Sequence, residues 1–175
     1  MTACYDKIVF RPIFFEILSL LLWGGLLCIC PSCSEDEQEQ LLPDAPVRAT
    51  LRLDDAEYVR LQNKGEYIRV TEKRGPFTYI GVGGLLVVNS MLPMDEANPY
   101  AVYDLYCPYC YYRSTIVPHP RVEVSDNILR AVCPECKSEY DISSGFGGCI
   151  KGPGKQLQVY HARYSAGNHT LILRN

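Results

Sequence analysis

Hydrophobic and polar positions alternate along most of the chain after residue 46, and this alternation predicts β-strands. Residues 47–53 place Val, Ala, Leu and Leu on one side of a strand and Arg, Thr and Arg on the other. Similar runs recur to the end of the chain, separated by turn-forming Gly, Pro, Asn and Asp. The pattern predicts an all-β domain. Its expected strands are 47–53, 67–70, 77–80, 84–88, 100–106, 114–117, 121–124, 128–132, 139–142, 156–164 and 169–173.

A different pattern occupies the N-terminal region, where residues 13–30 are almost entirely apolar. Lys7 and Arg11 precede this run, and its densest part, 17–30, is shorter than the about 20 residues that span a bilayer as a helix. A basic start followed by a short apolar run is typical of a secretory signal. The alternative is an uncleaved membrane anchor.

The residues directly after the apolar run resemble the processing site of a bacterial lipoprotein signal. Pro31 and Ser32 precede Cys33, and a polar, acidic stretch follows it. The resemblance implies that Cys33 is acylated on its sulfur and becomes the first residue of the mature protein. Cys28 and Cys30 are the alternative lipidation sites.

The acidic stretch at 34–40 resembles the surface-export signal of some Gram-negative lipoproteins. This resemblance implies an outer-membrane lipoprotein of the cell envelope, exposed at the cell surface, with the membrane as a partner through the lipid anchor. The stretch is also a solvated linker, because its seven polar residues have no apolar partner with which to pack. We therefore divide the chain into a signal peptide at 1–32, a flexible acidic tether at 33–46 and a β domain at 47–175.

Composition and charge exclude some classes of function. Thirteen Gly and twelve Pro argue against a long helical bundle, while a hydrophobic content of 47% allows a packed core. The net charge is −3, from 17 basic and 20 acidic residues. Proteins that bind nucleic acid neutralise phosphates with a basic excess, which this chain lacks. We expect no nucleic-acid partner.

Two cysteine motifs provide the candidate chemistry. Cys107-Pro108-Tyr109-Cys110 and Cys133-Pro134-Glu135-Cys136 are separated by 22 residues, close to the spacing of known zinc sites. Each motif follows a predicted strand, so that two loops can present four thiolates as a tetrahedron. Such a set suits Zn²⁺ or a single iron ion. In an exported protein, disulfides or free thiols are the alternative.

The same region resembles the Rieske proteins. Residues 103–109 and 132–141 look like the two cluster-binding loops of that family, and further matching positions are Gly145, Gly152-Pro153-Gly154 and 157–160. The resemblance covers about residues 77–175. It implies a fold of three stacked antiparallel sheets with two rubredoxin-like Cys knuckles, and it implies that Gly152, Pro153 and Gly154 form the loop that covers the site.

The chain departs from the Rieske pattern at the ligands themselves. A Rieske centre uses Cys-x-His in one loop and Cys-x-x-His in the other, whereas Tyr109 and Cys136 stand at the two histidine positions. Cys110 and Cys136 offer thiolates instead, so the metal set is Cys107, Cys110, Cys133 and Cys136. His119, in a turn between the motifs, is an alternative ligand.

The expected cofactor is a Cys₄-bound zinc or iron ion, or a [2Fe–2S] cluster. The n-region has no Arg pair, and a chain exported unfolded would arrive without a preassembled cluster, which favours zinc. We expect a structural or binding module of the envelope, with an envelope protein as a further partner. No catalytic set is visible, so a non-enzymatic role is favoured over an enzyme. The alternative function is electron transfer through [2Fe–2S], and Cys149 is expected to be dispensable.

Overall fold

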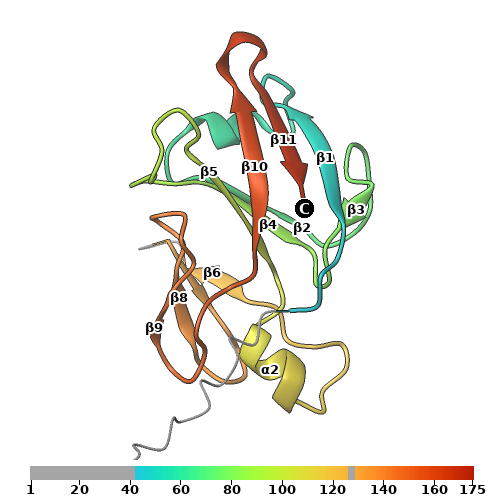
Figure 1. The fold of residues 1–175 in the computed structure, drawn as a ribbon, viewed down its shortest axis with the longest axis vertical. Helices are drawn as coiled ribbons and strands as arrows, with labels where there is room; N and C mark the ends of the chain where they lie inside the picture. The colour runs from blue at the N-terminus through green and yellow to red at the C-terminus, as the bar shows by residue number, and fades with distance from the viewer. Residues whose placement is uncertain (1–41, 126–128) are drawn as a thin grey trace, which may run out of the picture. The chain divides into compact units, whose positions relative to one another are not determined.

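The computed structural model describes residues 42–125 and 129–175, and strands dominate them (Figure 1). The predicted signal peptide, Cys33 and the tether up to residue 41 lie outside the described residues. Within the described part, no helix is long and apolar enough to cross a membrane. The elements are β1 (Val47–Arg52), η2 (Val59–Gln62), β2 (Tyr67–Val70), β3 (Tyr79–Ile80), β4 (Leu85–Asn89), β5 (Tyr100–Asp104), α2 (Pro108–Arg113), β6 (Glu123–Ser125), β7 (Arg130–Val132), β8 (Glu139–Asp141), β9 (Cys149–Lys151), β10 (Val159–Ser165), η3 (Ala166–Asn168) and β11 (Thr170–Arg174).

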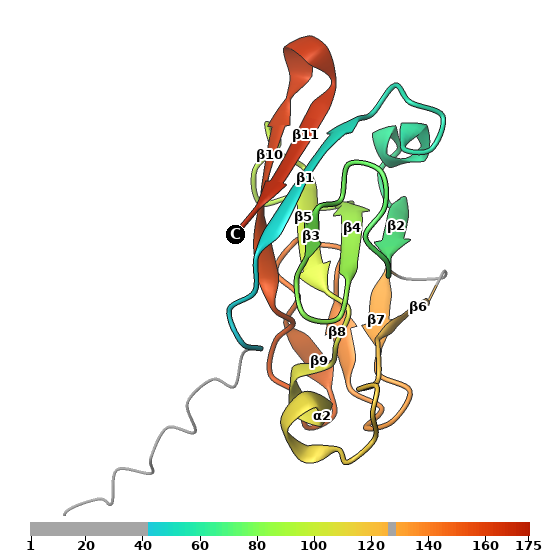
Figure 2. The same ribbon diagram turned by 90° about the vertical axis from the view of Figure 1, so that its right-hand side faces the viewer.

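The strands form a seven-stranded sheet, in the order β2-β4-β5-β10-β11-β1-β3, and a four-stranded sheet, β6-β7-β8-β9 (Figures 1 and 2). All pairings are antiparallel. The start of β10 pairs with β5, and its remainder pairs with β11, so this strand passes from one half of the larger sheet to the other. The predicted fold class, all-β with stacked antiparallel sheets, is confirmed.

One face of the larger sheet encloses the first apolar core. On β1, Val47, Ala49 and Leu51 are buried while the residues between them are exposed, as the alternation predicts. Strands β4 and β5 are instead buried at every position. Side chains of β4 alternate between two clusters, because this strand has a core on each of its faces.

The second cluster fills the space between β4–β5 and the four-stranded sheet. It joins Leu86 and Tyr103 of the larger sheet to Ala131 and Tyr140 of the smaller one. Three of the four motif cysteines are buried in the same cluster. The loops that contain the two cysteine motifs, 107–110 and 133–136, therefore extend from the second apolar core, at the end where α2 lies (Figure 1).

Three local predictions were wrong. The segment after Cys107 is the helix α2, since Pro108 takes the first helical position, where proline is well tolerated. Residues 114–117, predicted as a strand, form no strand. The sequence pattern also missed β9, a three-residue strand that pairs with β8. Apart from these strands, Leu42 lies within the predicted tether at 33–46 and is buried.

Candidate metal centre

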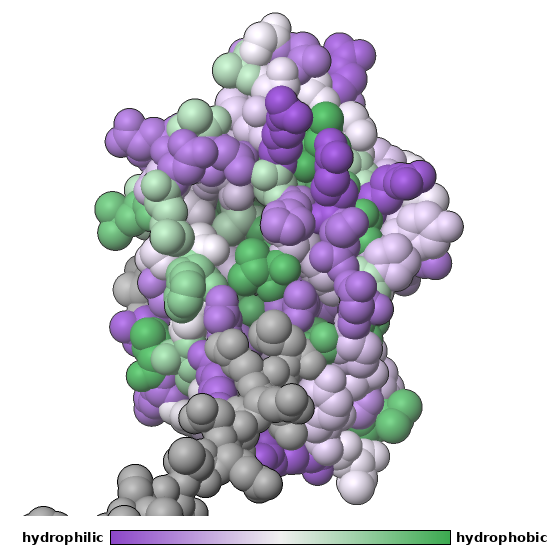
Figure 3. Space-filling model, viewed as in Figure 1, coloured by the Kyte–Doolittle hydropathy of each residue, from purple (hydrophilic) through white to green (hydrophobic). Residues whose placement is uncertain are grey.

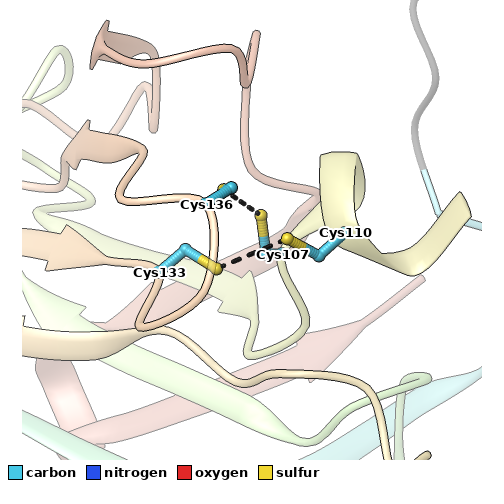
Figure 4. Close-up of side chains that lie close together, drawn as sticks. All are labelled: Cys107, Cys110, Cys133 and Cys136. Carbon is cyan, nitrogen blue, oxygen red and sulfur yellow. Dashed lines mark hydrogen bonds between the residues drawn. The ribbon is translucent and has the colours of Figure 1, made fainter. Parts of the chain in front are cut away.

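Two loops bring the four motif cysteines together (Figure 4). Cys107 follows β5 and caps the N-terminus of α2, and Cys110 lies one helical turn further along. Cys133 and Cys136 lie in the turn that connects β7 to β8. In Figure 4 the sulfur atoms of both loops point toward one another.

The separations of the sulfur atoms match a site for one ion. All four Sγ atoms lie within 4.8 Å of one another. The Sγ atoms of Cys107 and Cys136 are 3.7 Å apart, and so are those of Cys110 and Cys133. A tetrahedral ion with metal–sulfur bonds of about 2.3 Å has sulfur–sulfur edges of about 3.8 Å. The observed edges are too long for disulfides, in which the sulfurs are about 2.0 Å apart.

The cluster is largely closed to solvent. Cys107 and Cys133 have exposed fractions of 0% and Cys110 of 3%, while Cys136 is half-buried. All five described cysteines are free thiols. A buried set of four soft sulfur ligands can hold a zinc or iron ion and leaves no coordination position for a substrate.

Hydrogen bonds concentrate negative charge on one of the four sulfurs. The Cys107 thiol donates to Cys133, and the backbone N–H groups of Cys136 and Glu135 add to this, lowering the pKa of Cys133 to about 5. The pKa of Cys107 is raised, first because its thiol is the donor to Cys133 and then because it is buried. Burial is the main cause that raises the pKa of Cys110 to about 12. In the metal-free site, Cys133 is therefore the sulfur that loses its proton first, before Cys107 and Cys110.

Two polar side chains of the smaller sheet contact the sulfur atoms. The Tyr140 hydroxyl lies 3.2 Å from Cys107 Sγ, and burial raises the pKa of Tyr140, so this hydroxyl remains a donor. The Ser138 hydroxyl lies 3.1 Å from Cys136 Sγ. Once metal binding converts both cysteines to thiolates, Tyr140 and Ser138 can each donate to a sulfur. These contacts were not predicted from the sequence.

The predicted covering loop packs on these same two side chains. The backbone N–H of Gly154 donates to Ser138 Oγ over 3.0 Å. A Cβ atom on Gly154 would lie 2.3 Å from Tyr140 Oη, and one on Gly152 would lie 2.7 Å from Ser138 Cα. Gly152 also has a φ of +96°, which favours glycine. Only glycine allows the loop to approach this closely, whereas Pro153 between them is exposed.

The remaining candidate residues lie outside the sulfur cluster. The ring of His119 stacks against Tyr111, with 4.5 Å between the ring centroids, and is not part of the ligand group. Tyr109, at a Rieske histidine position, lies beneath the guanidinium of Arg113. The Cys149 thiol donates to the Lys151 carbonyl oxygen and is likewise outside the group.

Comparisons with known proteins add little to this geometry. No family model matches the chain, and the search of curated proteins found no match. The chain is similar to a crystal structure assigned as an NADH-dependent nitrite reductase small subunit from Mycobacterium tuberculosis. The identity is 13%, the match covers 75% of this chain and 97% of that chain, and the TM-score is 0.35.

Proposed function

We propose that this protein is an exported, lipid-anchored module of the cell envelope in which four cysteine thiolates bind a single metal ion. The observation that supports the metal site is the separation of the sulfur atoms, 3.7 Å for two pairs and at most 4.8 Å for any pair. The two separations of 3.7 Å correspond to edges of one tetrahedron around an ion with metal–sulfur bonds of about 2.3 Å. The ion is zinc, or one iron in the same geometry.

The ion has a structural role in this proposal. Catalytic zinc sites use three protein ligands and keep a fourth position open for water or substrate, whereas structural sites are closed by four. Here four thiols converge and at least three of them are buried. The site therefore stabilises the two loops and presents their outer surface to an envelope partner.

A [2Fe–2S] centre of the Rieske type fits this chain less well. Tyr109 and Cys136 replace both histidine ligands that raise the Rieske potential. A two-iron cluster also places two irons and two sulfides between the ligand pairs, which must then be further apart than one tetrahedron edge. To accept such a cluster, the four sulfur atoms, which all lie within 4.8 Å of one another, would have to move apart.

The anchor is proposed from the sequence alone. The apolar run at 13–30 ends in Pro31-Ser32-Cys33, in the order of a lipoprotein processing site. One acyl chain binds a bilayer only marginally, so firm attachment requires the two or more chains that lipoproteins carry. Envelope and outer-membrane localisation follow from this anchor.

Elemental analysis of the protein purified from its native envelope tests the metal proposal. We expect one zinc or one iron per chain, no acid-labile sulfide, and loss of the ion in Cys110→Ser. Cys149→Ser is the matched control, because Cys149 lies outside the sulfur cluster and should leave the metal content unchanged. Two irons and two sulfides per chain, with strong visible absorption, would establish the electron-transfer alternative instead.

The anchor is tested separately by metabolic labelling with a fatty acid. Cys33→Ala should abolish the label and leave an unprocessed chain, whereas Cys149→Ser should be labelled as the parent protein is. Label that persists in Cys33→Ala would assign the anchor to Cys28 or Cys30. No label in the parent protein would leave the apolar run itself as the anchor.

A further inference from the structure

The outer face of β1, β11 and β10 holds an array of basic side chains. Pairing places Arg48 directly beside Arg174, and Arg174 directly beside His161, so that one row crosses three strands. Arg163 lies in the next row and Arg52 in the row beyond it. The nine outward positions of this face are Arg48, Thr50, Arg52, Thr170, Ile172, Arg174, His161, Arg163 and Ser165. Figure 3 shows hydrophilic side chains gathered over these strands.

This basic face has no acidic residue of its own. All four arginines and His161 are exposed, and none of them has an ion pair or side-chain hydrogen bond with any residue that the structure describes. Like charges placed directly opposite each other on neighbouring strands destabilise a sheet. The directly paired Arg48 and Arg174 are therefore a cost to the isolated domain that an anionic partner would remove.

The basic face is not the result of a generally basic domain. Of the 17 basic and 20 acidic residues of the chain, two basic and six acidic residues precede Leu42, which leaves 15 and 14 in the residues from 42 onward. The domain is thus nearly neutral, and its positive charge is concentrated on one sheet face. Arginines elsewhere, such as the exposed Arg60 and the half-buried Arg130, are each paired with a glutamate.

The chain that leads toward the proposed anchor joins the domain at the edge of this face. The side-chain amide of Asn175 donates to Asp44 Oδ1 and, over 3.1 Å, to the Ala45 carbonyl oxygen. Asn175 directly follows Arg174, and β1 begins two residues after Ala45. Eight residues separate Leu42 from Cys33, and even a fully extended segment of that length spans only about 30 Å.

We propose that the basic face docks on an anionic lipid surface and so sets the orientation of the domain on its membrane. This inference rests on the proposed lipid anchor, which would keep a bilayer within reach. The face is a sheet surface with four long arginine side chains, whose guanidinium groups can reach several lipid phosphates at once. Each arginine near an anionic bilayer increases binding roughly fivefold, and the attraction weakens with salt over a Debye length of about 10 Å.

Arginine footprinting of the full-length protein in vesicles tests this docking. The protein is reconstituted in neutral phosphatidylcholine vesicles and in vesicles with phosphatidylglycerol added, then labelled with phenylglyoxal and analysed by mass spectrometry. At low salt, Arg48, Arg163 and Arg174 should react at least about threefold more slowly in the anionic vesicles. This protection should disappear at high salt. Arg60 and Arg130 should react equally in both kinds of vesicle.

A pair of variants with equal charge change sharpens the test. Arg163→Gln/Arg174→Gln should remove the protection of Arg48, whereas Arg60→Gln/Arg130→Gln should retain it. Thermal melting of each variant verifies that it is folded. Equal labelling of Arg48 in neutral and anionic vesicles would overturn the docking, and so would equal protection in detergent without lipid, which would indicate cover by another protein surface. Flotation with vesicles tests the anchor separately. Protein that floats only at low salt would dock through the basic face without being acylated.

Discussion

The two sheets of this domain are stabilised in different ways. Strands of the larger sheet run to six residues in β1 and seven in β10, and they enclose a cluster of Leu, Val and Tyr side chains. In the smaller sheet every strand has only three residues. The apolar cluster that packs on the smaller sheet includes cysteines, whereas the cluster of the larger sheet consists of aliphatic and aromatic residues. Strands this short give too few ladder hydrogen bonds to be stable by themselves.

In the proposed metal-bound protein, the ion adds to the smaller sheet the stability that apolar burial gives to the larger one. Cys133 follows β7 and Cys107 follows β5. An ion between them would link the smaller sheet to β5, whose side chains belong to both apolar clusters. Since metal binding energy at such a site is also folding energy, removal of the ion should affect one sheet far more than the other.

The largest effect is expected when one ligand is removed. Cys133→Ser should release the ion and lower the free energy of opening of β6–β9 by at least about 5 kcal/mol, which is a part of the about 10–16 kcal/mol that zinc contributes to isolated fingers. Hydrogen exchange measured by mass spectrometry should show fast exchange in β6–β9 while β4, β5, β10 and β11 stay protected. Cys149→Ser is the control and should change neither sheet. Equal loss of protection in both sheets would contradict the comparison.

The reciprocal change acts on the larger sheet. Leu171 on β11 is fully buried in the first cluster, and Leu171→Ala should lower the free energy of unfolding by about 2–5 kcal/mol through lost burial and a cavity. Metal content should stay at one ion per chain, because no ligand belongs to that cluster. Chemical denaturation and elemental analysis of the same sample measure both quantities. Metal lost to the extent seen in Cys133→Ser would show that the two sheets are not independent.

Acid should act selectively on the metal site. In the metal-free protein, Cys107 and Cys110 keep their protons because their pKa values are raised, that of Cys110 to about 12. The pKa of Cys133 is lowered to about 5, so this thiol loses its proton before the other two. Binding must then displace at least two protons, and the affinity falls at least roughly a hundredfold for each unit by which the pH decreases. Calorimetry in two buffers of different ionisation enthalpy counts the protons, and release of fewer than two would contradict this charge distribution.

A smaller effect is expected from a single methyl group under the covering loop. Gly154→Ala would place a Cβ 2.3 Å from Tyr140 Oη, so the loop must move away from the site, at a cost of about 1–3 kcal/mol. Gly167→Ala is the matched control, because nothing lies within 4 Å of the added Cβ in the β10–β11 turn. Thermal melting and the rate of metal loss to a chelator compare the two. Equal rates would show that the loop does not protect the site.

The strands of the larger sheet could be predicted from the sequence because their pattern is local. Residues 47–52 alternate cleanly, and 85–88 form a continuous apolar run between turn residues. The sequence pattern is weaker in the smaller sheet and in the segment after Cys107. Residues 149–151 are too few to show a period, and Tyr109, Tyr111 and Tyr112 favour strands although α2 forms there after Pro108.

The ligand set could be predicted because the spacing of each Cys pair is itself a local signal. Contacts around the ligands are different, since they depend on tertiary structure. Tyr140 lies 33 residues from Cys107 in the sequence, and Gly154 lies 16 from Ser138. Only the folded sheets bring these groups together. The basic face was missed for the same reason, because Arg48, Arg174 and His161 become neighbours only through strand pairing.

X-ray absorption at the metal edge of the protein purified from its native cells tests the central claim most directly. One ion bound by Cys107, Cys110, Cys133 and Cys136 predicts a single shell of four sulfurs at about 2.3 Å and no neighbouring metal. A metal–metal distance would contradict the single-ion site and indicate a two-iron cluster. A nitrogen shell at about 2.0–2.1 Å would mean that a histidine takes the place of one of the four thiolates.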